Sequence, residues 1–120
     1  MTMTTTWIRD IQGFAEFDEY VLNASHTQPV LVDFWADWCG PCLFLAPVLK
    51  QVIEDYQGQV LLAKVDTEED ENLKLAGRYK VRGFPTVVLI EKGEEVARFS
   101  SSRSVPYVRE FVETHATLLS

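Results

Sequence analysis

The stretch that decides the fold covers residues 35–42 and reads Trp-Ala-Asp-Trp-Cys-Gly-Pro-Cys. It follows an apolar run at residues 30–34 and precedes an amphipathic run at residues 43–56. The first run is typical of a strand buried on both faces, and the second has the spacing of an amphipathic helix. A strand is therefore expected to lead into a helix whose first turn holds the only two cysteines of the chain, Cys39 and Cys42.

The two cysteines are spaced so that a disulfide can form and break with little backbone movement. On a helix, residues three apart lie on one side, with Cβ atoms roughly 5–6 Å apart, which nearly matches what a disulfide requires. The unpaired N–H groups and partial positive charge at a helix N-terminus favour a thiolate, which lowers the pKa of a cysteine there. Pro41 lacks the N–H that would be unpaired in a first turn, and Gly40 leaves the approach to Cys39 open.

Three interpretations of the cysteine pair compete. A structural disulfide across three residues closes a very short loop and stabilises the fold little through chain entropy. A zinc site needs four ligands, and the two histidines, His26 and His115, lie far apart without ligand spacing. Redox chemistry is therefore favoured, with no metal. Cys39 is expected to be the exposed attacking thiol, and Cys42, one turn further, the shielded resolving thiol.

Composition and charge limit the other function classes. A chain of 120 residues with 47% apolar and 12% aromatic residues indicates one folded domain spanning residues 1–120. The net charge of −7 disfavours nucleic acid and anionic membrane surfaces as partners. No apolar run approaches the ~20 residues of a membrane span, and the N-terminus does not read as a signal peptide. The expected location is the cytoplasm, where a cysteine pair is more often catalytic or metal-binding than structural.

The order of predicted elements indicates an α/β fold in which helices cover both faces of a mixed sheet. Helix starts that carry reactive groups should then lie at the carboxyl edge of the sheet. Strands are expected at residues 4–9, 30–36, 60–66, 86–91 and 96–100, and helices at residues 12–24, 39–56, 67–79 and from Ser104 onward.

Asp33 interrupts the apolar strand that leads to the cysteines. Burial of a carboxylate is expensive, and the pKa of Asp33 should rise. Lys64, in the neighbouring apolar strand, is the natural partner for an ion pair. Such a pair is compatible with a catalytic role for the carboxylate.

Together with Asp33, Lys64 and Pro85, the octapeptide at residues 35–42 resembles the active-site signature of the thioredoxin family. The resemblance extends over about residues 14–114. It implies the thioredoxin fold, a central mixed five-stranded sheet flanked by four helices. It also implies a thiol–disulfide oxidoreductase that reduces protein disulfides and serves electron transport, with no cofactor beyond its own redox-active disulfide. The implied partners are disulfide-containing target proteins and a thioredoxin reductase, and the chain is expected to be a monomer.

The resemblance assigns roles to individual residues. Asp33, beside Lys64, would be the general base for the Cys42 thiol, as the family mechanism implies with water carrying the proton between them. Pro85 would be a cis-proline packed against the cysteine pair, so that the backbone before it can pair with an extended substrate. The residues implied to contact substrate are Trp38, Gly40, Pro41, Phe84, Pro85 and Ser101.

Two positions depart from the family pattern. Leu43 stands where the family usually has a basic residue, which exposes apolar surface, and Ser101 stands where many members have a glycine lining the substrate groove. The apolar surface around Trp38, Leu43 and Phe84 also suggests an alternative function. In that interpretation the chain is a non-catalytic thioredoxin-fold module that docks into a larger assembly.

Overall fold

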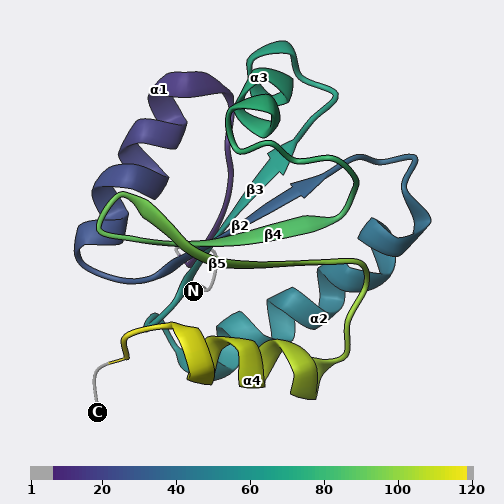
Figure 1. The fold of residues 1–120 in the computed structure, drawn as a ribbon. Helices are drawn as coiled ribbons and strands as arrows, with labels where there is room; N and C mark the ends of the chain where they lie inside the picture. Colours follow the sequence, from purple (N-terminus) through teal and green to yellow (C-terminus); the bar gives the residue numbers. More distant parts are fainter. Residues whose placement is uncertain (1–6, 119–120) are drawn as a thin grey trace, which may run out of the picture.

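The computed structural model describes residues 7–118. Its five strands form one mixed sheet in the order β1-β3-β2-β4-β5 (Figure 1). Strands β1, β3 and β2 are parallel, whereas β4 runs antiparallel to β2 and β5 antiparallel to β4. The strands are β1 (Ile8–Asp10), β2 (Val30–Trp35), β3 (Leu61–Asp66), β4 (Thr86–Glu91) and β5 (Glu94–Ser100).

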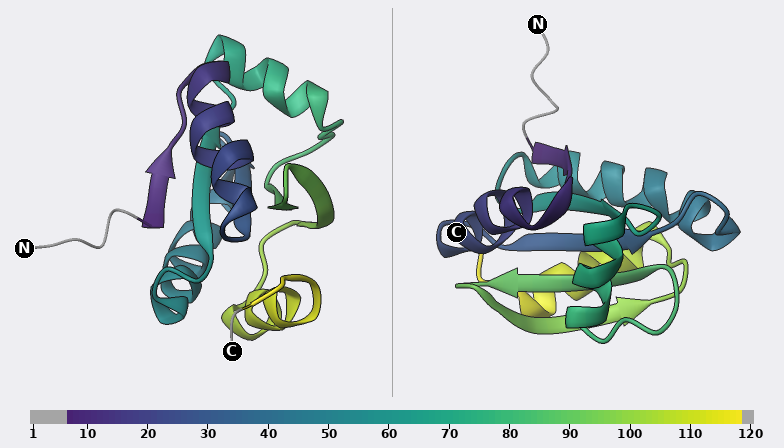
Figure 2. Two further views of the ribbon diagram at one scale, coloured as in Figure 1. Left: turned by 90° about the vertical axis from the view of Figure 1, so that its left-hand side faces the viewer. Right: turned by 90° about the horizontal axis from the view of Figure 1, so that it is seen from above.

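Four α-helices flank this sheet, as the resemblance implied. Helices α1 and α3 lie on one face, and α2 and α4 lie on the other, as the two views of Figure 2 make clear. The helices are α1 (Gly13–Phe17), α2 (Gly40–Tyr56), α3 (Asp70–Arg78) and α4 (Val105–His115). The N-terminal helical run was expected over residues 12–24. It continues beyond α1 with π-helical residues 18–23 and a 3-10 turn at residues 24–26.

Strand β2 divides the apolar core into two layers by simple alternation. Val32 and Phe34 pack with the layer under α1 and α3, while Leu31 packs with the layer under α2 and α4. All three side chains are fully buried. Because side chains alternate along a strand, Asp33 lies on the same face as Leu31, which is the face covered by the cysteine-bearing helix α2.

Several element boundaries differ from expectation for local reasons. Helix α3 begins at Asp70 and not at residue 67, because residues 66–69 form a turn in which the Asp66 carboxylate accepts a hydrogen bond from the Glu68 N–H. Strand β1 starts at Ile8, and residues 4–6 of the expected first strand lie outside the described residues. Helix α4 follows the prediction, since the Ser104 hydroxyl accepts a hydrogen bond from the Tyr107 N–H at 3.2 Å.

Candidate active site at the start of helix α2

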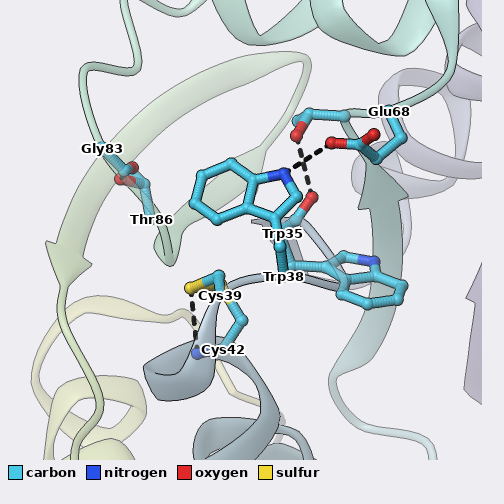
Figure 3. The surroundings of a disulfide bond; sticks show 8 residues. Trp35, Trp38, Cys39, Cys42, Glu68, Gly83 and Thr86 are labelled. Carbon is cyan, nitrogen blue, oxygen red and sulfur yellow. Dashed lines mark hydrogen bonds between the residues drawn. A yellow bond between two sulfur atoms is a disulfide. The ribbon is translucent and has the colours of Figure 1, made fainter.

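The two cysteines lie where strand β2 leads into helix α2, at the carboxyl end of β2. Cys39 is the N-cap residue of α2, and its sulfur accepts a hydrogen bond from the Cys42 N–H at 3.2 Å (Figure 3). The two residues form a disulfide with their Cα atoms 5.3 Å apart. Pro41 occupies the first turn, where its missing N–H leaves no helical hydrogen bond unmade. The spacing thus produces the bond that was predicted from the sequence.

The expected difference in exposure between the two sulfurs is not present in the disulfide form. Cys39 is 5% exposed and Cys42 is 2% exposed, so both are buried. They pack with Ala36, and the side chains of Trp35 and Phe84 cover this small cluster. The prediction of an exposed Cys39 was wrong for the disulfide form, because the residue is buried in a cluster against which Trp35 and Phe84 pack.

The surface beside the disulfide is open and largely apolar. Trp38 is 66% exposed, and Gly40 and Pro41 are exposed in the loop and first turn. Leu43 and Phe44, which follow Cys42, are 54% and 75% exposed. The departure at Leu43 therefore does place an apolar side chain on the surface, as the sequence indicated.

Among residues 7–118, Asp33 is the one buried carboxylate. It is 1% exposed, and its Oδ1 atom has no hydrogen-bond partner among the described residues. Burial raises the pKa of Asp33 to about 7, and the positive charge of Lys64 opposes part of that rise. A carboxyl group with such a pKa can both accept and release a proton near neutral pH.

Lys64 is next to Asp33 in the sheet, but the expected ion pair is not formed. The two residues are register partners on β2 and β3. Within residues 7–118 they are not among the ion pairs closer than 4.0 Å. The Lys64 ammonium instead lies 5.2 Å from the centre of the Trp35 ring, a cation–π arrangement on a half-buried side chain. The lysine side chain can therefore keep its charged end nearer water while acting on Asp33 through space.

The segment before β4 forms the other wall of the site. The Phe84–Pro85 peptide bond is cis, as the resemblance implied. The Phe84 ring meets the Trp38 ring edge-on with centroids 6.0 Å apart. The Thr86 hydroxyl donates to the Gly83 carbonyl at 2.7 Å and closes the turn, which Figure 3 shows facing the disulfide. Phe84 thus contacts both the cysteine cluster and the exposed tryptophan.

Ser101 adjoins this wall from the end of β5. Its N–H donates to the Pro85 carbonyl at 3.1 Å, and its backbone has φ 75°, in the left-handed region that favours glycine. Ser101 lines the same surface pocket as Gly83 and Phe84. The serine therefore keeps the backbone conformation that a glycine would adopt here, and adds a hydroxymethyl group at the pocket.

Sequence reasoning missed two residues that hold the site from the end of β3. The Trp38 indole N–H donates to the Glu68 carboxylate at 2.6 Å, and Thr67 donates twice to the Trp35 carbonyl, each time at 2.9 Å. The sequence pattern places both residues in the helix expected at residues 67–79. Their partners lie about thirty residues away in the sequence, so no local pattern could have identified them.

No group of three or more His, Cys, Asp or Glu side chains in residues 7–118 could hold a metal ion. None of the helices described is both long and apolar enough to cross a membrane.

Comparison with known proteins agrees with this geometry. The thioredoxin family model matches residues 11–114. The chain belongs to the thioredoxin family. A thioredoxin from Pseudomonas aeruginosa is 41% identical over 101 residues, which cover 84% of this chain and 90% of that protein. Thioredoxin 1 from Nostoc sp. is 46% identical over 80 residues, covering 67% of this chain and 71% of its own length.

A solved thioredoxin structure has the same fold as this chain. A thioredoxin mutant from Halobacterium salinarum superposes with a TM-score of 0.80 at 35% sequence identity, covering all of both chains. Thioredoxin relatives and a cysteine pair at bonding distance make this chain a thiol–disulfide oxidoreductase that acts on protein disulfides.

Proposed function

We propose that the chain works as a protein-disulfide reductase in which Cys39 attacks and Cys42 resolves. The observation that carries this proposal is the position of Cys39 at the N-cap of a 17-residue helix, with the Cys42 N–H directed at its sulfur. Unpaired N–H groups and the helix dipole stabilise negative charge there, so reduction of the disulfide should leave a thiolate on Cys39.

The reaction transfers two electrons to the target, breaks the target disulfide and forms the Cys39–Cys42 disulfide. The Cys39 thiolate attacks one sulfur of the target disulfide, and the other target sulfur leaves as a thiolate. Cys42 then loses its proton and attacks the Cys39 sulfur. The Cys39–Cys42 disulfide forms, and the second target sulfur leaves. The target is reduced by two electrons, and the enzyme is oxidised by two.

Asp33 is proposed as the general base that takes the Cys42 proton. A pKa of about 7 and an Oδ1 atom without a partner support this role, because such a group has both proton affinity and a free acceptor. Asp33 also lies on the sheet face that α2 covers. Lys64 is proposed to tune the carboxyl group, since its charge lowers the pKa that burial raises.

Target binding is proposed to use the open surface around the disulfide. Trp38, Gly40 and Pro41 form one side of it, and Phe84, Pro85 and Ser101 form the other. An extended target segment could pair with the backbone before β4 in the manner of an added strand. A thioredoxin reductase is proposed to restore the dithiol, so that the chain serves electron transport. The chain is proposed to act as a monomer. Its proposed location is the cytoplasm, since a cysteine pair of this kind suits a reducing compartment.

Reduction of insulin by dithiothreitol tests the proposal directly. The wild type should accelerate insulin reduction, and Cys39→Ser should lose essentially all of that acceleration, because the remaining thiol, Cys42, does not occupy the N-cap of α2 and serves only the resolving step. Equal turnover by both proteins would refute it. Unfolding curves of both proteins provide the control for folding.

The order of attack has its own test. Cys42→Ser should accumulate stable mixed disulfides between Cys39 and target proteins, because the resolving thiol is missing. The matched control is Cys39→Ser, which should trap none. Trapping by Cys39→Ser in place of Cys42→Ser would reverse the assigned roles. A double variant that kept partner binding and biological effect would favour the alternative of a non-catalytic binding module.

A further inference from the structure

A pocket of about 550 Å³ opens beside the proposed target-binding surface, and its lining carries only one sign of charge. Three cationic side chains line it, and we call it the cationic pocket. Two serine hydroxyls at the end of β5 and the Phe84 side chain also line this pocket, and within residues 7–118 no aspartate or glutamate does. The residues concerned are Lys80, Arg82, Arg98, Ser100, Ser101 and Phe84.

The cationic pocket is continuous with the disulfide through Phe84. This side chain lines the pocket and also packs on the cluster of Ala36, Cys39 and Cys42. The turn from Gly83 to Thr86 faces the disulfide in Figure 3. A target segment that lies across the disulfide along this turn therefore passes the mouth of the cationic pocket.

The three cations differ in how far they are already neutralised. Arg98 donates to the Glu95 carboxylate at 2.6 and 2.8 Å and to the Tyr79 carbonyl at 2.7 Å, so it is fixed and paired. Lys80 and Arg82 are exposed, and within residues 7–118 neither belongs to an ion pair. Two uncompensated positive charges therefore remain at this pocket on a chain whose net charge is −7.

An acidic residue lies across the site from this pocket. Figure 3 shows Glu68, whose carboxylate accepts a hydrogen bond from the Trp38 indole N–H, on the other side of the cysteines from Gly83. The target-binding surface thus has an acidic side and a basic side, with the disulfide between them. Such an arrangement favours opposite charges on the two flanks of a bound segment.

We propose that the cationic pocket binds a side-chain carboxylate of the target, an aspartate or glutamate near the reactive cysteine on one flank. This inference rests on the proposed reductase function and adds the charge class of its targets. Lys80 and Arg82 supply the attraction, and the Ser100 and Ser101 hydroxyls are available as hydrogen-bond donors.

Peptide disulfides of defined sequence provide the test. One pair of peptides carries glutamate or glutamine two residues before the reactive cysteine. A second pair carries them two residues after it. Single-turnover reduction by the reduced wild type is quenched with acid and analysed by chromatography. At low salt we expect the glutamate peptide to react about fivefold faster than the glutamine peptide at one of the two positions. The factor is small because each exposed ion pair with Lys80 or Arg82 contributes little to the binding free energy. The preference should fall steeply in 0.5 M salt.

The variant Lys80→Gln/Arg82→Gln should lose most of this preference and still reduce the glutamine peptide at the wild-type rate. The matched control is Lys50→Gln/Lys92→Gln, which removes the same charge from exposed residues outside the pocket. Lys92 has φ 52° and Lys80 has φ 57°, so the two lysines occupy similar backbone conformations. The control should keep the preference.

Failure of this inference is distinguishable from failure of the proposed function. Equal reduction of glutamate and glutamine peptides by the wild type at both positions would overturn the inference and leave the reductase intact. A preference that survives Lys80→Gln/Arg82→Gln would overturn it as well. If the wild type reduced no peptide faster than Cys39→Ser, the proposed function itself would be wrong.

Discussion

At the scale of single residues, the most consequential side chain after the cysteines is Asp33. A buried carboxylate whose Oδ1 atom has no hydrogen-bond partner is costly in the middle of a sheet, and burial raises its pKa to about 7. The same burial that makes Asp33 unfavourable for folding gives it the proton affinity of a general base. Function and stability therefore oppose one another at this position.

Asp33→Asn should stabilise the protein at neutral pH. The pKa of Asp33 rises from 3.8 unfolded to about 7 folded, so its contribution to stability is fully present below pH 3.8 and is lost as the pH rises through 7. At about 1.4 kcal/mol per unit, this amounts to about 4 kcal/mol. Asparagine does not ionise in this range. Urea unfolding of both proteins between pH 4 and 8 should show the wild type weakening relative to the variant, and parallel profiles would contradict this account.

Ser101→Gly should increase stability by about 1 kcal/mol, because a side chain at φ 75° is sterically disfavoured and glycine is not. Ser102→Gly is the matched control, since Ser102 does not have a positive φ and glycine there only adds freedom to the unfolded chain. Denaturant midpoints of the three proteins provide the measurement. A loss of stability in Ser101→Gly would mean that the serine hydroxyl makes a contact that outweighs the backbone strain.

At the scale of elements, the site depends on three segments that approach one sheet edge. The start of α2 supplies the cysteines, the turn before β4 supplies Phe84, and the turn after β3 holds the tryptophans through Thr67 and Glu68. The last of these turns is itself held by α3. Asn72, fully buried on α3, donates to the carbonyls of Ile11 and Asp66 and accepts from the Gly13 N–H.

Asn72→Ala should lower the free energy of unfolding by about 2–3 kcal/mol, because three backbone groups from two separate loops lose their partner. Asn23→Ala is a suitable control, because Asn23 is exposed at the end of the N-terminal helical run. Urea unfolding followed by circular dichroism measures both. An equally small decrease in the free energy of unfolding of both variants would show that the hydrogen bonds of the buried Asn72 amide do not stabilise these loops.

At the scale of the whole molecule, two apolar layers and one sheet fix where the reactive groups meet. Helices α2 and α4 close one layer, and α1 and α3 close the other (Figure 2). The disulfide lies at one edge of this assembly and not inside a layer. The overall charge of −7 says little about the site, because Lys80 and Arg82 give the pocket beside it the opposite sign.

Local sequence was enough to predict the strand-to-helix junction, the spacing that allows a disulfide and the start of the last helix at Ser104. Each of these follows from local period, helix geometry or capping, which act over a few residues. Local sequence could not predict the burial of both cysteines, the separation of Asp33 from Lys64, the hydrogen bond from Trp38 to Glu68 or the cationic pocket. These depend on side chains that are distant in the sequence, and packing sets their separations and directions only once the sheet has formed.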